Sequence, residues 1–412
     1  MRSRVLRSTR PARRPTAAAA ALVMMAGLAA CSTAGPTSSS DGSGDAPAAS
    51  GSADATESAA PEPVRITTGF ADPTAVPIDA PLTVSTVGGH LDDVRVTSPA
   101  GPVQGSLSDD GTWTASTRLE PGTDYRLIAS ATRSDGSTVE RARRFHTVEL
   151  TLDEQTFPSV APLDGETVGV GMPVVVTFDL PVTDRARFER HMAVTSTPAQ
   201  KGSWYWLSDR EAHYRPAHYW RPGTDVSVDL DINSLPAGNG IYGQESRRLD
   251  FHIGDSVVSR VDVRSHTMRT FVNGKLARTI PISAGKPGWE TRSGTKVVIE
   301  KFRQKRMNAA TIGVSEGDPE YYDLSNVEYA LRVTYSGEFL HAAPWSVGSQ
   351  GSANVSHGCV GMSVADAQWL YDRTSRGDVV EVTGSARQMT LDNGYGDWNL
   401  SAADWKQGSA LS

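Results

Sequence analysis

The sequence of 412 residues contains very little cysteine, only Cys31 and Cys359. If Cys31 is consumed by processing, as expected below, one thiol remains and an intramolecular disulfide is excluded. An unpaired thiol in an exported chain is open to oxidation. Cys359 is therefore either a small buried apolar residue or a residue with a chemical use, and composition alone leaves both readings open.

The sequence also lacks an excess of positive charge and any basic stripe with interleaved aromatic residues. The formal net charge is −7, from 40 Lys and Arg against 47 Asp and Glu. This balance argues against a nucleic-acid partner. What is abundant is turn-forming sequence, with 38 Gly and 24 Pro spread along the chain, which favours many short strands over long helices.

The amino terminus has the pattern of an export signal. Six arginines fall between residues 2 and 14 and precede an apolar run over 17–30, which is too short to span a bilayer core of about 30 Å. The run ends Leu28-Ala29-Ala30-Cys31, which resembles the lipobox of bacterial lipoproteins. We therefore expect a signal peptide over 1–30, a lipidated Cys31, and a chain anchored on the outer face of the cell membrane, facing the cell wall. The alternative is plain cleavage after Ala30, with Cys31 incidental.

Residues 32–62 consist mostly of Ser, Gly, Ala, Asp, Thr and Pro. Such a segment cannot bury enough apolar surface to offset its ordering entropy, so it is expected to be a flexible linker.

Two strand-rich modules follow, over 63–148 and 149–254. Short alternating segments separated by Gly, Pro and Asp turns at spacings of roughly 8–12 residues predict a β-sandwich for each module. In the second module, Trp204 and Trp206 would share one face of a strand and Tyr205 the other. The two tryptophans are expected in the sandwich core, with a sugar-stacking platform as the alternative.

The chemistry-bearing residues fall in a third region, 255–383. A strand is predicted over 257–263, and a hairpin over 270–278 with Asn273-Gly274 at its turn. His341 and the run Ser356-His357-Gly358-Cys359 follow. A free thiol with a pKa of about 8.5 is only slightly ionised at neutral pH, so a neighbouring imidazole that takes its proton would activate it.

Small residues flank this cysteine. Gly358 and Gly361 would let backbone N–H groups approach a developing oxyanion, and one such donor is worth about 3 kcal/mol. A partial metal site is the competing interpretation of the His-Gly-Cys run, although a structural zinc would need a fourth ligand. We expect no metal and no cofactor.

Residues 256–383 resemble the catalytic domain of the L,D-transpeptidases, a family marked by a distant His and a Ser-His-Gly-Cys core. The segments 341–347, 354–359 and 376–382 resemble actinobacterial, mycobacterial-type members. So does the architecture, which implies a mostly β chain: a lipoprotein signal, two immunoglobulin-like β-sandwiches, a β-rich catalytic domain, and a tail over 384–412 that docks on the upstream modules through Trp398 and Trp405.

The resemblance implies a mechanism. Cys359 would attack the L-centre carbonyl of meso-diaminopimelate in a tetrapeptide stem and expel the terminal D-Ala. His341 would act as general base and then acid, and the amides of His357, Gly358 and Cys359 would form an oxyanion hole. An acceptor meso-diaminopimelate amine from a neighbouring stem would resolve the thioester into a 3→3 cross-link. Carbapenem β-lactams are the implied inhibitors.

The resemblance also implies substrate contacts from Met307, Tyr322, Trp345, Ser356 and Gly361. Met307 and Tyr322, with Tyr321, fall where relatives form a lid, and ordinary packing is the alternative there. For His357 the alternative is a structural histidine that holds the loop. Two departures from the family pattern place Ala342 where relatives have Ser and Gly361 where they have Asn or Arg.

Three other functions compete with this one. A sortase-like enzyme would need a downstream arginine, for which Arg373 or Arg376 would have to serve. A cell-wall thiol peptidase usually places Cys before His, the reverse of the order here. A binding protein would have an inert third domain, and replacing Cys359 would leave its function intact.

Overall fold

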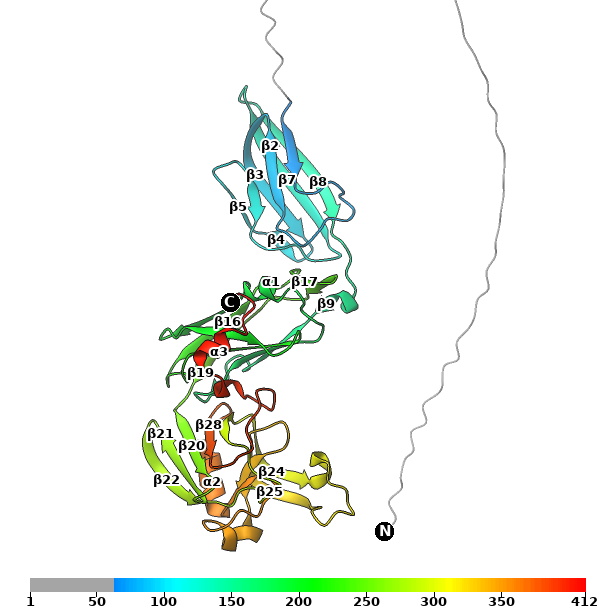
Figure 1. The fold of residues 1–412 in the computed structure, drawn as a ribbon. Helices are drawn as coiled ribbons and strands as arrows, with labels where there is room; N and C mark the ends of the chain where they lie inside the picture. Colours follow the sequence, from blue (N-terminus) through cyan, green and yellow to red (C-terminus); the bar gives the residue numbers. More distant parts are fainter. Residues whose placement is uncertain (1–62) are drawn as a thin grey trace, which may run out of the picture. The chain divides into compact units, whose positions relative to one another are not determined.

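The computed structural model describes residues 63–412, and over this range the chain is mostly β-structure (Figure 1). The predicted signal peptide 1–30, the lipidation site Cys31 and the linker 32–62 lie outside the described residues. Between residues 63 and 412, no helix has the length and apolar character needed to cross a membrane.

The first sandwich is built from two four-stranded sheets that share one hydrophobic core. Side chains alternate between buried and exposed along β7, as the two-residue period of a strand requires. Its core draws on both sheets, for example through Val84 and Leu127. The sheets run β1 (Arg65–Thr68), β2 (Thr83–Val87), β6 (Trp113–Ala115), β5 (Gly105–Leu107) and β4 (Gly101–Val103), β3 (Gly89–Ser98), β7 (Asp124–Arg133), β8 (Thr138–His146).

The second sandwich repeats this plan and confirms the core interpretation of the two tryptophans. Trp204 and Trp206 are buried in its core, and Tyr205 on the opposite face stacks on Trp405 of the tail at 4.7 Å. The sheets run β10 (Pro158–Ala161), β12 (Val174–Phe178), β15 (Glu211–Pro216), β14 (Gly202–Trp206) and β11 (Thr167–Val168), β19 (Arg247–Ile253), β16 (Asp225–Leu230), β13 (Met192–Thr197). Shorter elements complete it: η1 (Leu152–Glu154), α1 (Arg185–Glu189), β9 (Gln155–Thr156), β17 (Pro236–Gly238) and β18 (Ile241–Gly243).

Two sheets form the third region. Asn273 and Gly274 have φ of 48° and 76°, which confirms the predicted tight hairpin turn between β21 and β22. The five-stranded sheet runs β22 (Lys275–Pro281), β21 (Thr267–Val272), β20 (Val257–Asp262), β28 (Val379–Thr383), β23 (Gly294–Val297). The four-stranded sheet runs β24 (Glu300–Asn308), β25 (Asp323–Arg332), β26 (Phe339–Ala342), β27 (Val360–Met362).

A helix not predicted from the sequence covers part of this region. Helix α2 (Val364–Arg373) begins at Ser363, whose side chain accepts from the Asp366 N–H, and it buries Ala367 and Leu370 in the core of the third region. The short helices η2 (Ala309–Ile312) and η3 (Pro344–Ser349) lie in the connections that follow β24 and β26.

The carboxyl-terminal tail packs on the second sandwich, as predicted. It contains η4 (Asp397–Asn399) and α3 (Ala402–Lys406). Trp398 Nε1 donates to Gly171 O at 2.8 Å and Trp405 Nε1 to Ser203 O at 3.0 Å. The Arg215 guanidinium lies 4.6 Å from the ring centre of each tryptophan.

The hydrophobic core of the second sandwich continues into the third region. This core contains Val297 and Val379 from the five-stranded sheet and Tyr395 from the tail. The second sandwich, the third region and the tail therefore share one core.

Candidate active site

The parallel pairing of β26 with β27 brings the distant His beside the Ser-His-Gly-Cys segment. His341 is paired with Gly361, two residues after Cys359. The side chains of His341 and Cys359 both line one cavity of about 300 Å³. Of the predicted site residues in the described range, only Gly358 does not line this cavity. The predicted residues that line it are Met307, Tyr322, His341, Trp345, Ser356, His357, Cys359 and Gly361. Sequence reasoning missed its other lining residues, Ser283, Leu324, Ala343, Ser346 and Val355.

His341 is held by a backbone contact that survives the Ala342 departure. The imidazole is buried, and its Nδ1 lies 2.8 Å from Ala342 O. A carbonyl only accepts hydrogen bonds, so this contact assigns the proton to Nδ1 and leaves Nε2 with a free lone pair. Trp345 stacks near the ring at 5.8 Å, is 56% exposed and lines the cavity.

Cys359 and His341 are both shifted toward their neutral forms. Burial raises the pKa of the Cys359 thiol to about 12. Burial lowers the pKa of His341, and the bond to Ala342 opposes this only in part. The thiol Sγ lies 3.6 Å from Gly337 O, to which it donates. At neutral pH the two groups are therefore a thiol and a neutral imidazole.

The loop before Cys359 is braced by two hydroxyl groups. Ser356 Oγ donates to Cys359 O at 2.6 Å and accepts from Gly358 N–H at 3.1 Å. Thr291 Oγ1 donates to Gly358 O at 2.8 Å. Gly358 has φ of 121°, a conformation that favours glycine. Because the Gly358 amide already donates to Ser356, an oxyanion would be served by the other two amides, of His357 and Cys359.

His357 lies between the loop and the predicted lid. Its Nε2 is 2.7 Å from Glu320 Oε2, and the same carboxylate oxygen contacts the Lys286 ammonium. A hydrogen bond from Lys286 and a smaller effect of the hydrogen bond from His357 lower the pKa of Glu320. The His357 ring also packs against Trp289 at 4.9 Å and Tyr322 at 5.1 Å. These contacts fit a histidine that holds the loop and ties it to the segment before β25.

A second cavity, of about 230 Å³, is also lined by Cys359. It shares Cys359, Met307 and Tyr322 with the first cavity and is also bordered by Gly337 and Phe339. Cys359 therefore borders both cavities. Tyr321 lines neither cavity, and its hydroxyl accepts from Asn308 Nδ2 at 3.1 Å.

The Gly361 departure has a steric account. A Cβ at this position would lie 2.8 Å from Ala343 Cβ, closer than carbon atoms approach. A side chain here would require the segment after His341 to shift, so Gly361 contributes space to the cavity and not a polar contact.

Two competing interpretations find no support in this geometry. Arg373 donates to Trp369 O, and Arg376 pairs with Glu166, so neither arginine of the sortase interpretation lines either cavity. Within residues 63–412, no set of three or more His, Cys, Asp or Glu side chains is arranged to hold a metal ion.

Two family models match the chain. Residues 256–382 match the family described as the L,D-transpeptidase catalytic domain, and residues 73–236 match the bacterial Ig domain. The Ig match runs across both sandwiches, so the boundary between 148 and 149 stays a prediction.

Two curated relatives come from Mycobacterium tuberculosis. L,D-transpeptidase 2 is 37% identical over 81% of this chain and 82% of its own length. L,D-transpeptidase 5 is 36% identical over 85% of this chain and 78% of its own length. A solved L,D-transpeptidase in complex with imipenem is 39% identical, covers 55% of this chain and 97% of its own, and has a TM-score of 0.49. The chain belongs to the L,D-transpeptidase family.

Proposed function

We propose that this protein is a cysteine L,D-transpeptidase that forms 3→3 cross-links in peptidoglycan. Cys359 Sγ attacks the carbonyl at the L-centre of meso-diaminopimelate, the third residue of a tetrapeptide stem. A C–S bond forms, the bond to the terminal D-Ala breaks, and D-Ala leaves as a free amine. The observation that carries this proposal is that β26 and β27 bring His341 and Cys359 into one cavity.

His341 serves as the base and then the acid. Its contact with Ala342 O directs the Nε2 lone pair away from the backbone, and its lowered pKa keeps it neutral and ready to accept a proton near pH 7. The proton taken from the thiol passes to the leaving amine of D-Ala. Acid–base help of this kind is worth roughly 10²–10⁴ in rate.

The rigid loop supplies charge stabilisation. The amides of His357 and Cys359 are the proposed donors to the oxyanion, while Ser356 and Thr291 fix the Gly358 peptide between them. Loss of one such preorganised donor costs roughly 10²–10³ in kcat. Ser356, Gly358 and the side chain of His357 therefore act mainly by holding the loop.

A nucleophile that borders two cavities is suited to a transferase, which must bind a donor and an acceptor. A donor stem can occupy one cavity, while the amine of an acceptor stem approaches the thioester through the other. Attack by that amine forms the new amide and returns the thiol. Met307 and Tyr322 border both spaces and are proposed to contact substrate, together with Trp345 in the first cavity. Carbapenem β-lactams, whose strained amide is open to the same attack, are proposed to acylate Cys359.

The proposed location is outside the cell membrane, with Cys31 lipidated and the linker 32–62 extending the folded part toward the wall. The sandwiches are proposed as the part that positions the catalytic region at this distance. Peptidoglycan stems are then the natural partners.

A product assay tests the function. The purified chain is incubated with disaccharide-tetrapeptide, and mass spectrometry follows the loss of D-Ala and the appearance of a cross-linked dimer. Wild type and the control His252→Asn, which changes a histidine of β19 in the second sandwich, are expected to form dimer. Cys359→Ser and His341→Asn are expected to form none or far less. Dimer formation by Cys359→Ser at the wild-type rate would refute the proposal.

A further inference from the structure

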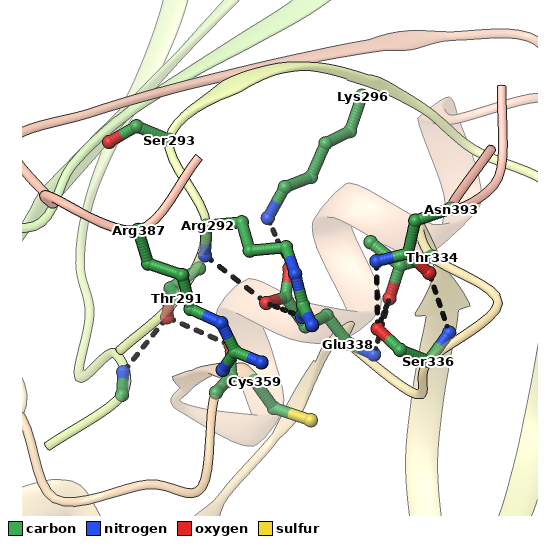
Figure 2. Close-up of polar contacts among 12 residues, drawn as sticks. Thr291, Arg292, Ser293, Lys296, Thr334, Ser336, Glu338, Cys359, Arg387 and Asn393 are labelled. Carbon is green, nitrogen blue, oxygen red and sulfur yellow. Dashed lines mark hydrogen bonds and ion pairs between the residues drawn. The ribbon is translucent and has the colours of Figure 1, made fainter. Parts of the chain in front are cut away.

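A cluster of three charged residues, two of them buried, lies near Cys359, and none of the three lines either cavity (Figure 2). Lys296 on β23 and Glu338, just before β26, have side chains that are 1% and 5% exposed, and the Lys296 ammonium contacts Glu338 Oε2. Arg292 Nη1 lies 2.8 Å from Glu338 Oε1, and its own side chain is 15% exposed. None of the three lines the cavity that holds His341.

Burying these ions is costly, so the cluster needs an explanation beyond packing. Each buried ion loses several kcal/mol of hydration, and apolar residues of similar volume are often as stabilising as a buried ion pair. Two cations and one carboxylate also leave a net charge of +1 in the interior. Burial lowers the pKa of Lys296, and the Glu338 carboxylate opposes this shift.

The cluster is connected to the nucleophile through the backbone on both sides. Glu338 follows Gly337, whose carbonyl accepts from the Cys359 thiol at 3.6 Å. The Glu338 carboxylate accepts from the Arg292 N–H at 3.1 Å, and the preceding residue, Thr291, donates its hydroxyl to Gly358 O at 2.8 Å. The carboxylate therefore links the two segments that contact the thiol and the peptide before it (Figure 2).

The tail holds the turn that carries Glu338. Glu338 N–H donates to Thr334 Oγ1 at 2.8 Å, and Asn393 of the tail bonds to Ser336 through its Oδ1 and Nδ2 at 2.8 and 2.9 Å. This segment has few ways to relax, so the position of Gly337 O is well defined.

The charge of the cluster acts directly on the sulfur. Glu338 disfavours the thiolate of Cys359, and Lys296 opposes this effect and favours the thiolate. Tyr322 before β25, whose pKa is raised to about 12 by burial and by Cys359, and His341 on β26 line the same cavity as the thiol. His357 also lines this cavity, and Lys305, Arg306 and Arg332 line the second cavity with Cys359. The charged side chains that shift the pKa of the thiol are Glu338 and Lys296.

We propose that the buried Arg292–Glu338–Lys296 cluster is a positioning element for Cys359. It fixes the Gly358–Cys359 peptide, and its Lys296 ammonium offsets the Glu338 carboxylate, which would otherwise oppose the negative charge that develops on the sulfur during attack. This inference rests on the proposed role of Cys359 as the nucleophile. It assigns to Lys296, Glu338 and Arg292 an effect on the reaction through Cys359, without contact with substrate.

The test measures how fast iodoacetamide alkylates Cys359 in the folded chain between pH 7 and 9. Below the thiol pKa, this rate follows the thiolate fraction, and a shift of one pKa unit changes it about tenfold. Lys296→Met removes the ammonium and leaves the Glu338 carboxylate to act on the sulfur, so it is expected to slow alkylation about tenfold. Lys296→Met combined with Glu338→Gln removes this carboxylate as well and is expected to recover most of the rate.

The recovery separates charge from structure. Asp378→Asn removes another buried carboxylate, one that accepts from Ser375 N–H and does not act on Cys359, and it is expected to leave the alkylation rate unchanged. If Lys296→Met alkylates at the wild-type rate, or the double variant is as slow as Lys296→Met, the proposal is overturned.

A second pair covers the case in which Lys296→Met does not fold. Thr291→Val removes the hydroxyl that holds Gly358 O, and Thr291→Ser keeps it. Thr291→Val is expected to slow acylation by a carbapenem about tenfold while alkylation by iodoacetamide is unchanged, and Thr291→Ser to behave as wild type. Equal acylation by both variants would overturn the positioning role. Because alkylation needs no transpeptidase activity, this experiment can fail while the proposed function stands, and the reverse also holds.

Discussion

A buried histidine joins the tail to the second sandwich, and its charge should make stability depend on pH. His213 on β15 is 1% exposed, and its Nδ1 lies 2.8 Å from Asp397 Oδ1 of the tail. Its Nε2 lies 2.9 Å from Glu211 Oε1. Burial alone would lower the pKa of His213, but the carboxylates of Asp397 and Glu211 outweigh it and raise the pKa to about 9.

The size of the effect follows from linkage. The pKa of His213 rises from about 6.5 in the unfolded chain to about 9 in the folded chain, a difference of about 2.5 units and hence about 3 kcal/mol. Because the folded pKa is the higher one, this stabilisation is fully present below pH 6.5. It is lost as the pH rises through about 9. Removing one partner of a buried ion pair costs a similar amount, about 3–5 kcal/mol.

Asp397→Asn tests this linkage, with Asp392→Asn as the matched control on an exposed part of the same tail. Urea unfolding followed by tryptophan fluorescence at pH 6, 8 and 10 gives the midpoints. We expect Asp397→Asn to be destabilised strongly at pH 6 and most of this gap to close by pH 10, while Asp392→Asn follows wild type throughout. A gap that is equally large at pH 6 and pH 10 would show that His213 carries no charge in the folded chain.

Three further predictions follow. The pKa of His341 lies below its ordinary value of about 6.5, so the rate of Cys359 acylation by a carbapenem should be constant from pH 7 to 8 and fall only below pH 6.5. Stopped-flow absorbance measures this rate, and a fall that begins above pH 7 would contradict the prediction. Trp405→Ala should cost about 3–5 kcal/mol of stability, measured by urea unfolding, since the side chain is 1% exposed and packs on Tyr205; a loss below 1 kcal/mol would mean that the docked tail adds little. Glu320→Gln should weaken the tie between the lid and His357 and raise hydrogen exchange over 309–322, and unchanged exchange would refute that tie.

Local patterns in the sequence were sufficient for much of the fold. Alternating strands gave the sandwiches, and the Asn273-Gly274 pair specified its hairpin because both positions need positive φ. Helix α2 was missed, although Ser363 followed three residues later by Asp366 is an N-cap pattern, because the apolar residues around it also fit a strand.

The residues of the site were predictable, but their geometry was not. The segments around His341 and Cys359 carried the family resemblance, and the structure brings them to one cavity. The role of the Gly358 amide was not predictable, because its bond to Ser356 depends on the loop conformation. The buried cluster left one signal: Lys296 and Glu338 carry opposite charge, and each comes directly before a run of apolar residues. Only their three-dimensional pairing shows that they compensate each other.

Intact-protein mass spectrometry shows directly whether Cys359 carries the tripeptide part of a stem as a thioester. The chain is mixed with disaccharide-tetrapeptide in the absence of added acceptor, quenched in acid within seconds, weighed, and then digested to locate any adduct. The account predicts a species heavier by the disaccharide-tripeptide acyl group, with the mass on the peptide that contains Cys359. Release of D-Ala with no adduct at Cys359, or with the adduct on another residue, would contradict it.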